Sequence, residues 1–281
     1  MSSNHLKWSI VDNGTVPFTL SHAAAAFPFR RTRLIPSALV IGTFAPDFEF
    51  FLRLAPRGPF GHTLRGVFVF TLPAALIVLW LFHRFLKRPA ALLLPEPFQR
   101  RTARYLGPFE FLPASRLALI VASILVGIAT HLVWDSFTHP QTWLYYHWPF
   151  LRQTVFIPIF GMVRYCRVFQ YVFTFVGIGI LWAWVNRWYH STKPSHEPCD
   201  RQLTPRGRAI LLGVIPAVSI ILGMMRAIVG ASLAARHHSF ERVLGDVVVT
   251  TIALAWWQLI VCGLLIHQPF FSRPRVYTRA G

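Results

Sequence analysis

The sequence has few charged residues and very few acidic ones. Charged residues make up 14% of its 281 residues, and only ten are aspartate or glutamate. Because an average soluble protein contains about 25% charged residues, the chain lacks the polar surface that a soluble protein of this size requires. It also has only three cysteines, whose spacing predicts neither a disulfide framework nor a zinc knuckle: Cys166, Cys199 and Cys262.

The apolar residues, 54% of the chain, gather in long blocks with almost no charge. A helix needs about 20 mostly apolar residues to cross the hydrocarbon layer of a bilayer, within a range of about 17–25. Five blocks reach or approach this length: 67–85, 117–134, 168–185, 209–225 and 247–266. The sequence therefore predicts an all-α, polytopic membrane bundle of about five transmembrane helices, with the lipid bilayer as its surroundings.

A sixth apolar block, residues 34–52, contains four residues that oppose an ordinary span: Pro36, Pro46, Asp47 and Glu49. Charges at membrane depth are costly, and interrupted helices survive there only where protein or a wet cavity covers them. We therefore expect a re-entrant or broken helix in this block. A complete crossing is the alternative, because it would place the basic residues at 30–33 on the cytoplasmic side.

The chain has a net charge of +18. Its lysines and arginines flank the apolar blocks and form no separate basic domain, so we expect no binding to nucleic acid. Lysine and arginine accumulate in loops on the cytoplasmic side of membrane proteins. Three segments, 84–116, 187–208 and the tail after His267, hold fifteen of these residues, whereas the two alternate loops hold five. This distribution predicts that the three basic segments face the cytoplasm.

The pattern of apolar and polar stretches divides the chain into three expected regions. Residues 1–185 form a membrane region that carries the motifs described below. Residues 186–208 are typical of a polar cytoplasmic loop, and residues 209–281 of a helix pair with a basic tail.

Histidines accompany the few acidic residues that lie near the apolar blocks. His131 and Asp135 are four residues apart, so they share one face of a helix. His139 follows one turn later, although Pro140 indicates that the helix ends there. Imidazole and carboxylate together suit zinc, iron or manganese. A helix-end histidine capped by Asp135 is the simpler alternative.

Three further residues, His22, Asp47 and His62, are expected to lie near this pair. His62 precedes a span that runs inward and His131 ends the span that returns, so both are expected at the extracytoplasmic face. Asp47 joins them if it lies at the outer end of its broken helix. His22 joins them only if residues 34–52 do not cross the membrane completely.

In their order along the chain, these motifs resemble those of the predicted membrane-bound metal-dependent hydrolases. The matching elements are His22, Pro46-Asp47-x-Glu49, Gly61-His62-Thr63 and Thr130-His131-x-x-x-Asp135-x-x-Thr138. The stretches PFTLSHAAAAFP, APDFEFFLRLAPRGPFGHTLRG and THLVWDSFTHP resemble more closely the bacterial family called domain of unknown function 4184. The chain departs from the hydrolase pattern at two places. The pattern has aspartate where this chain has Glu49, and it has a longer motif with two histidines where this chain has only His62.

The resemblance implies a divalent metal, zinc or manganese or iron, in a multi-pass protein of the bacterial cytoplasmic membrane. It implies metal ligands, or residues that orient them, at His22, Asp47, His62, His131 and Asp135. In a hydrolytic mechanism Glu49 or Asp135 would accept a proton from water. The substrate, a lipid-linked molecule or a phosphoester, would contact Arg53, Arg65 and His139.

A second hypothesis is a non-catalytic membrane protein with a transport or assembly role, in which the polar cluster is structural or conducts an ion. A transporter is expected to place its charges near the middle of the bilayer, on several helices. The candidate residues of this chain gather near one membrane face, which favours a surface site.

Overall fold

A computed structural model describes residues 19–55, 58–140, 142–158, 161–195, 203, 205–233 and 240–266. Nearly all elements in these ranges are helices, and two short strands form an antiparallel hairpin. Five helical stretches are long and apolar enough to cross a membrane: Leu64–Leu93, Ala114–His147, Tyr165–Ser191, Arg206–Gly230 and Val243–Leu264. The predicted all-α bundle of five spans is therefore confirmed, and the protein is a multi-pass membrane protein.

Short helical segments precede the first span. They are the 3₁₀ helix η1 (Thr19–Arg31), α1 (Pro36–Gly42), the 3₁₀ turn η2 (Ala45–Asp47), α2 (Phe48–Arg53) and the 3₁₀ turn η3 (Phe60–His62). The first span comprises α3 (Leu64–Gly66), the π-helical η4 (Val67–Thr71), α4 (Leu72–Leu81), the π-helical η5 (Phe82–Leu86) and α5 (Lys87–Leu93). Two short elements connect it to the next span: α6 (Glu96–Thr102) and η6 (Ala103–Tyr105).

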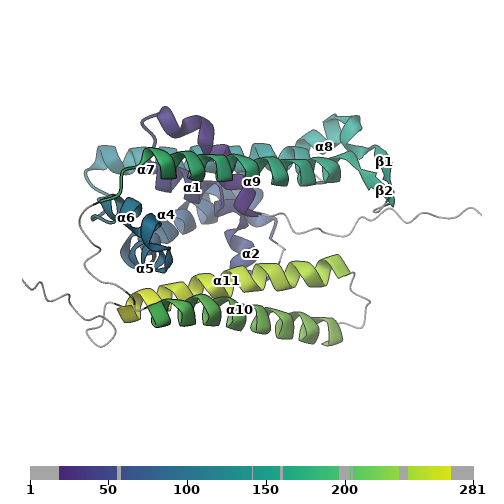
Figure 1. Cartoon of the computed structure of the whole chain (residues 1–281). Helices are drawn as coiled ribbons and strands as arrows, with labels where there is room; N and C mark the ends of the chain where they lie inside the picture. Colours follow the sequence, from purple (N-terminus) through teal and green to yellow (C-terminus); the bar gives the residue numbers. More distant parts are fainter. Residues whose placement is uncertain are drawn as a thin grey trace, which may run out of the picture.

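The second span, α7 (Ala114–Thr138), begins after Pro113 and ends just before His139 and Pro140. The end agrees with the position that Pro140 predicted. Four small elements follow: α8 (Trp143–His147), η7 (Pro149–Arg152), β1 (Thr154–Ile157) and β2 (Gly161–Arg164). The last three spans are α9 (Tyr165–Ser191), α10 (Pro205–Leu233) and α11 (Phe240–Ile266). Figure 1 shows α7 and α9 side by side, with α8 and the hairpin at one end, which we call the cap end.

The 3₁₀ helix η1 enters the bundle from the cap end and lies against α9. Ser21 packs at Gly177, where an added Cβ would lie 2.9 Å from the Ser21 Cβ. Further along, the rings of Phe27 and Trp184 are in edge contact at 5.9 Å. Because α9 runs away from the cap end, these two contacts show that η1 runs in the same direction.

The chain then returns along α7 through α1. The Ile35 N–H donates to Ser123 Oγ at 2.9 Å, and the Thr43 carbonyl oxygen lies 2.8 Å from His131 Nδ1. Both α1 and α7 therefore run toward the cap end at this point. Residues 34–52 therefore form a broken helix, as expected, and together with η1 the segment runs away from the cap end and back toward it, which fits the re-entrant interpretation.

Two glycines allow α1 to approach α7 closely. A Cβ on Gly127 would lie 2.8 Å from the Gly42 Cα, and a Cβ on Gly42 would collide with the Ile124 carbonyl oxygen. Small residues commonly permit such backbone contact between membrane helices. The main apolar core surrounds this crossing and includes Ala38, Ile41, Ala75, Leu79, Ile120, Ile124 and Ile128.

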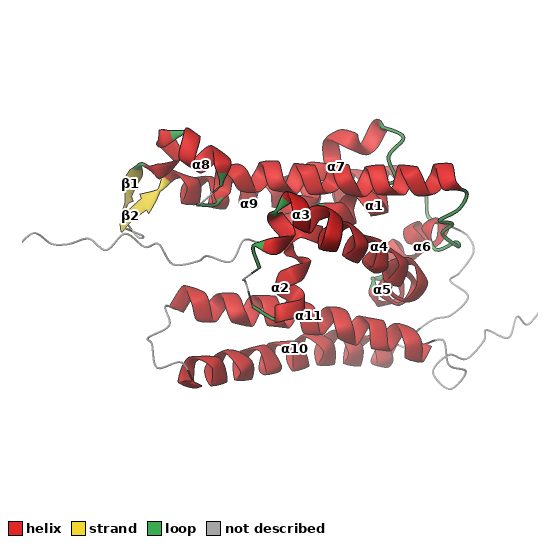
Figure 2. Ribbon diagram, turned by 180° about the vertical axis from the view of Figure 1, so that it is seen from behind, coloured by secondary structure: helices red, strands yellow, loops and turns green. Residues whose placement is uncertain are grey.

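The C-terminal helices α10 and α11 form an antiparallel pair beside the rest of the bundle (Figure 2). Near the middle of α11, Thr250 Oγ1 donates to the Leu54 carbonyl oxygen at 3.1 Å. At the end opposite the cap end, Gly263 lies against the Phe85 carbonyl. Residues 196–202 and 204 of the predicted polar loop (186–208) and the basic tail from 267 lie outside the described residues, so the three-region division stays a prediction.

Replacing Gly127 with leucine should destabilise the protein by about 1–3 kcal/mol or more, because the new side chain would push α1 away from α7. The matched control is Gly179→Leu in α9, where an added Cβ would meet no atom within 4 Å. Thermal unfolding in detergent would measure both variants. Equal melting temperatures for the two variants would contradict the close crossing.

Candidate metal centre

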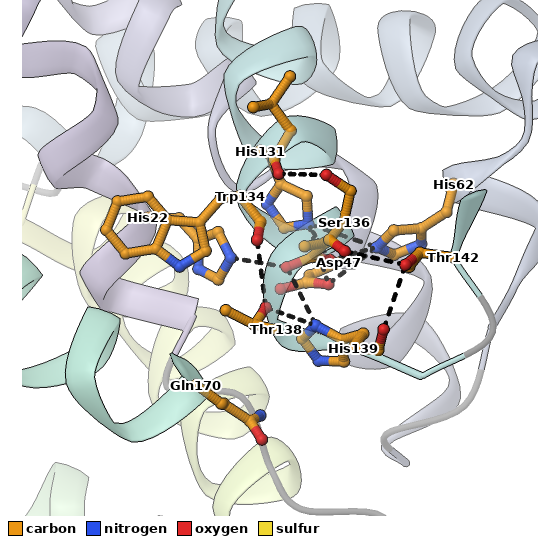
Figure 3. Close-up of polar contacts among 12 residues, drawn as sticks. His22, Asp47, His62, His131, Trp134, Ser136, Thr138, His139, Thr142 and Gln170 are labelled. Atoms are coloured by element: carbon orange, nitrogen blue, oxygen red, sulfur yellow. Dashed lines mark hydrogen bonds and ion pairs between the residues drawn. The ribbon is translucent and has the colours of Figure 1, made fainter. Parts of the chain in front are cut away.

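Five of the residues singled out in the sequence contact one another near the cap end. Figure 3 shows how His22, Asp47, His62 and His131 point toward one another. His22 comes from η1, Asp47 from the end of η2 and His62 from the end of η3, whereas His131 and Asp135 occupy the last two turns of α7. The predicted proximity of His131 and Asp135 is confirmed, since His131 Nε2 lies 3.0 Å from Asp135 Oδ2. Four separate segments of the chain thus supply one polar cluster.

Four ligand atoms of the cluster lie close together, with five of their six separations near those of a tetrahedral metal site. They are Asp47 Oδ1, His62 Nε2, His131 Nε2 and Asp135 Oδ2, and their five separations that involve a histidine are 3.0–3.7 Å. A tetrahedron whose corners lie about 2.0–2.1 Å from its centre, as in zinc sites, has edges of about 3.3–3.4 Å. The donor atoms therefore fit a metal ion in spacing as well as in chemistry.

Two overlapping sets of three residues could each hold an ion. Asp47, His62 and His131 form one set, and His22, His131 and Asp135 form the other; within each set the ligand atoms lie within 4.8 Å of one another. His131 belongs to both sets and is completely buried. It is therefore the residue on which any ion in this cluster depends most.

A backbone carbonyl fixes the orientation of His131. His131 Nδ1 lies 2.8 Å from the Thr43 oxygen, which can only accept, so Nδ1 carries the hydrogen and donates it. The lone pair of the neutral ring is then on Nε2, which faces the cluster. Metal-binding histidines typically have such a partner on their second nitrogen. The imidazole ring of His22 stacks on the other side, with 4.3 Å between ring centroids.

Asp135 uses its second oxygen to contact two more histidines. Oδ1 lies 3.0 Å from His22 Nε2 and 3.4 Å from His139 Nδ1. The Thr138 hydroxyl also lies 2.9 Å from His139 Nδ1. His22 therefore joins the cluster, as expected for a re-entrant segment, and His139, predicted to bind substrate, lies at its edge.

The two carboxylates and the histidines between them shift one another's pKa values. Burial raises the pKa of Asp47, but the charge of His131 and a hydrogen bond from His62 outweigh it, so the net shift is downward. Burial lowers the pKa of His62, but hydrogen bonds to Asp135 and Asp47 raise it to about 10. Both shifts indicate that the cluster favours positive charge between the carboxylates.

Glu49 is buried, but its contacts lie outside the cluster. Arg53 Nε donates to Oε1 at 2.9 Å, and the Gly61 N–H donates to Oε2 at 3.1 Å. The Gly61 carbonyl in turn accepts from Thr71 Oγ1 at 3.0 Å. Glu49, predicted as a proton acceptor, thus holds the loop that places His62. Arg53, predicted to bind substrate, forms an ion pair with Glu49.

Arg65, also predicted to bind substrate, is exposed on α3, three residues after His62. Sequence reasoning missed the Thr43 carbonyl and the Thr71 hydroxyl as parts of the centre. The break between α1 and η2 was the available signal for Thr43, because a helix end leaves carbonyl oxygens without intrahelical partners. Thr71 gave no signal, since a threonine in an apolar span most often contacts its own helix.

Comparison with known proteins places the chain in a family. The family model described as "Domain of unknown function (DUF4184)" matches residues 16–264, a range that includes every residue of the cluster and all five spans. No match was found among curated proteins or solved structures. The chain is therefore a multi-pass membrane protein that belongs to the DUF4184 family.

Proposed function

We propose that the protein is a membrane-bound, metal-dependent hydrolase with its metal centre at the extracytoplasmic end of the bundle. The observation that carries the proposal is the convergence of ligand atoms from Asp47, His62 and His131 within 4.8 Å of one another, with Asp135 Oδ2 beside both histidines. Zinc suits this set of donors, and manganese or iron suits it as well. The proposal also follows the resemblance of the motifs to the predicted metal-dependent hydrolases.

The excess of lysine and arginine in the segments at the opposite end supports an extracytoplasmic position of the cap end. The family resemblance suggests the cytoplasmic membrane of a bacterium. Because the cluster lies at one end of α7, access from one membrane face suffices. A pathway for transport would need polar groups along the whole bundle. The position of the cluster thus supports a hydrolase more than a transporter.

Asp47, His62 and His131 would hold the ion, and Asp135 would remain beside it. This division suits catalysis, because catalytic zinc sites use three protein ligands and keep one position open. A bound divalent ion would lower the pKa of a water molecule and polarise an ester bond. Asp135 is placed to accept the proton, with Oδ2 next to His62 and His131, and Oδ1 next to the partly exposed His139.

His22 would orient Asp135 rather than bind the ion. Its Nε2 lies 3.0 Å from Asp135 Oδ1, a contact in which the imidazole donates to the carboxylate. Residues that hold metal ligands or catalytic carboxylates in place typically change affinity or activity about 10–100-fold when removed. Glu49 has a similar supporting role through Gly61, on the opposite side of His62.

Purified wild-type protein should contain close to one ion of zinc, manganese or iron per chain, measured by plasma mass spectrometry in detergent. Asp47→Ala and His131→Ala should each lower metal affinity by more than about 100-fold, because each removes a ligand and not merely its support. The control is His190→Ala, at the far end of α9 where the side chain is exposed. A folded wild type without metal, even after incubation with all three ions, would overturn the proposal.

Glu49 and Asp135 can be separated by their amide variants. Asp135→Asn should lower turnover about 10²–10⁴-fold, because the amide cannot accept a proton from water. Glu49→Gln should retain both metal and turnover, since the amide oxygen still accepts from the Gly61 N–H, whereas Glu49→Ala should weaken metal binding about 10–100-fold. The reverse result, with Glu49→Gln inactive and Asp135→Asn active, would make Glu49 the proton acceptor.

A further inference from the structure

The depth of the cluster in the bundle restricts the molecules that can reach it. His131 lies fourteen residues beyond Leu117, where the apolar stretch of α7 begins, and three residues before Trp134, where it ends. At 1.5 Å per residue, His131 is about 21 Å from the first boundary and about 5 Å inside the second. The cluster therefore lies where the hydrocarbon layer gives way to the lipid headgroups.

The elements of the cap carry exposed aromatic side chains beyond this level. The exposed fractions are 71% for Trp143, 56% for Tyr146, 40% for Trp148 and 55% for Phe156. Tryptophan and tyrosine are enriched where membrane helices meet the headgroups. Since α8 and the hairpin follow the end of α7 (Figure 1), they mark the headgroup layer. The cluster is then on the membrane side of the cap.

The cluster is open at two edges, beside His62 and beside His139, and the first membrane span begins next to His62. The side chains of His62 and His139 are 25% and 27% exposed, whereas those of His22, Asp47 and His131 are at most 3% exposed. Leu64 and Phe68, at the start of the first span, are 78% and 56% exposed. Large apolar surfaces on a membrane span face lipid. We call His62, Leu64, Arg65 and Phe68 the mouth of the site.

Arg65 gives this mouth a positive charge at the same level. It is exposed between Leu64 and Phe68, while Arg53, the other predicted substrate residue, is already paired with Glu49. An arginine guanidinium binds phosphate through two parallel hydrogen bonds. An apolar rim that carries the exposed Arg65 beside a buried centre suits a molecule with acyl chains and an anionic phosphate.

We propose that the substrate is a phosphate ester of a membrane lipid, which reaches the centre from the bilayer past Leu64 and Phe68 and binds its phosphate to Arg65. This inference rests on the proposed hydrolase function and specifies its substrate. The water oxygen forms a bond to phosphorus while the bond from phosphorus to the lipid oxygen breaks. Asp135 accepts a proton of the water, and the lipid oxygen leaves as an alcohol with a proton from solvent.

A binding measurement tests the mouth without relying on activity. Native mass spectrometry of the purified protein would measure bound dipalmitoyl phosphatidic acid. Arg65→Ala should weaken this binding about tenfold, which corresponds to one charge-assisted hydrogen bond. The control Arg152→Ala removes an exposed arginine from the cap and should leave the binding unchanged. Equal binding by wild type, Arg65→Ala and Arg152→Ala would overturn the assignment of Arg65.

An activity measurement separates the substrate from the function. With metal-loaded protein, kcat/KM for phosphatidic acid in mixed micelles should exceed that for soluble glycerol phosphate by at least about 100-fold, because the acyl chains contribute binding energy only from the membrane. Equal metal-dependent rates for the two esters would overturn the lipid inference and leave the hydrolase intact. Lipid binding that depends on Arg65, without hydrolysis of any phosphate ester, would overturn the hydrolase and leave the lipid site.

Discussion

Two buried carboxylates impose the main constraint on this structure. Asp47 and Asp135 are almost fully buried in an apolar helix bundle, where a negative charge without partners costs several kcal/mol. Four histidines surround them, and each contacts at least one carboxylate oxygen at 3.0–3.7 Å. The chain must therefore bring histidines from distant segments to one place, and this requirement explains the short, irregular segments that carry His22 and His62.

The re-entrant segment satisfies this requirement by carrying His22 inward and Asp47 back out. Such a path places non-helical backbone at membrane depth, which is tolerated only where protein covers it. The close crossing of α1 and α7 at Gly42 and Gly127 supplies that cover. The crossing also brings the Thr43 carbonyl to His131. Because the helix is interrupted after Thr43, this carbonyl oxygen is available to accept a hydrogen bond from His131 and so to orient its ring. Packing of the segment and geometry of the centre thus depend on the same contact.

The centre combines a set of metal-binding donors with a surface that faces lipid. Its donor atoms lie close enough to share an ion, and the exposed Leu64, Arg65 and Phe68 follow His62 in the chain. For a family described only as a domain of unknown function, this arrangement connects the histidine motifs to a chemistry and to a route of access. The C-terminal pair contributes through α2, because Thr250 holds the Leu54 carbonyl just after the helix that carries Glu49.

The sequence by itself determined the spans, the broken helix and most members of the cluster. Apolar blocks of spanning length allow only a membrane helix, and the four-residue spacing of His131 and Asp135 fixes a shared helix face. Only the tertiary structure decided that the N-terminal segment is re-entrant, because charge counting favoured a crossing and close packing at two glycines favoured the return. Only the tertiary structure also distinguished Asp135 from Glu49, two buried carboxylates that the sequence had proposed for the same role. Asp135 faces the histidines, whereas Glu49 is held by Arg53 and the Gly61 N–H, since partners distant in sequence determine where a buried carboxylate points.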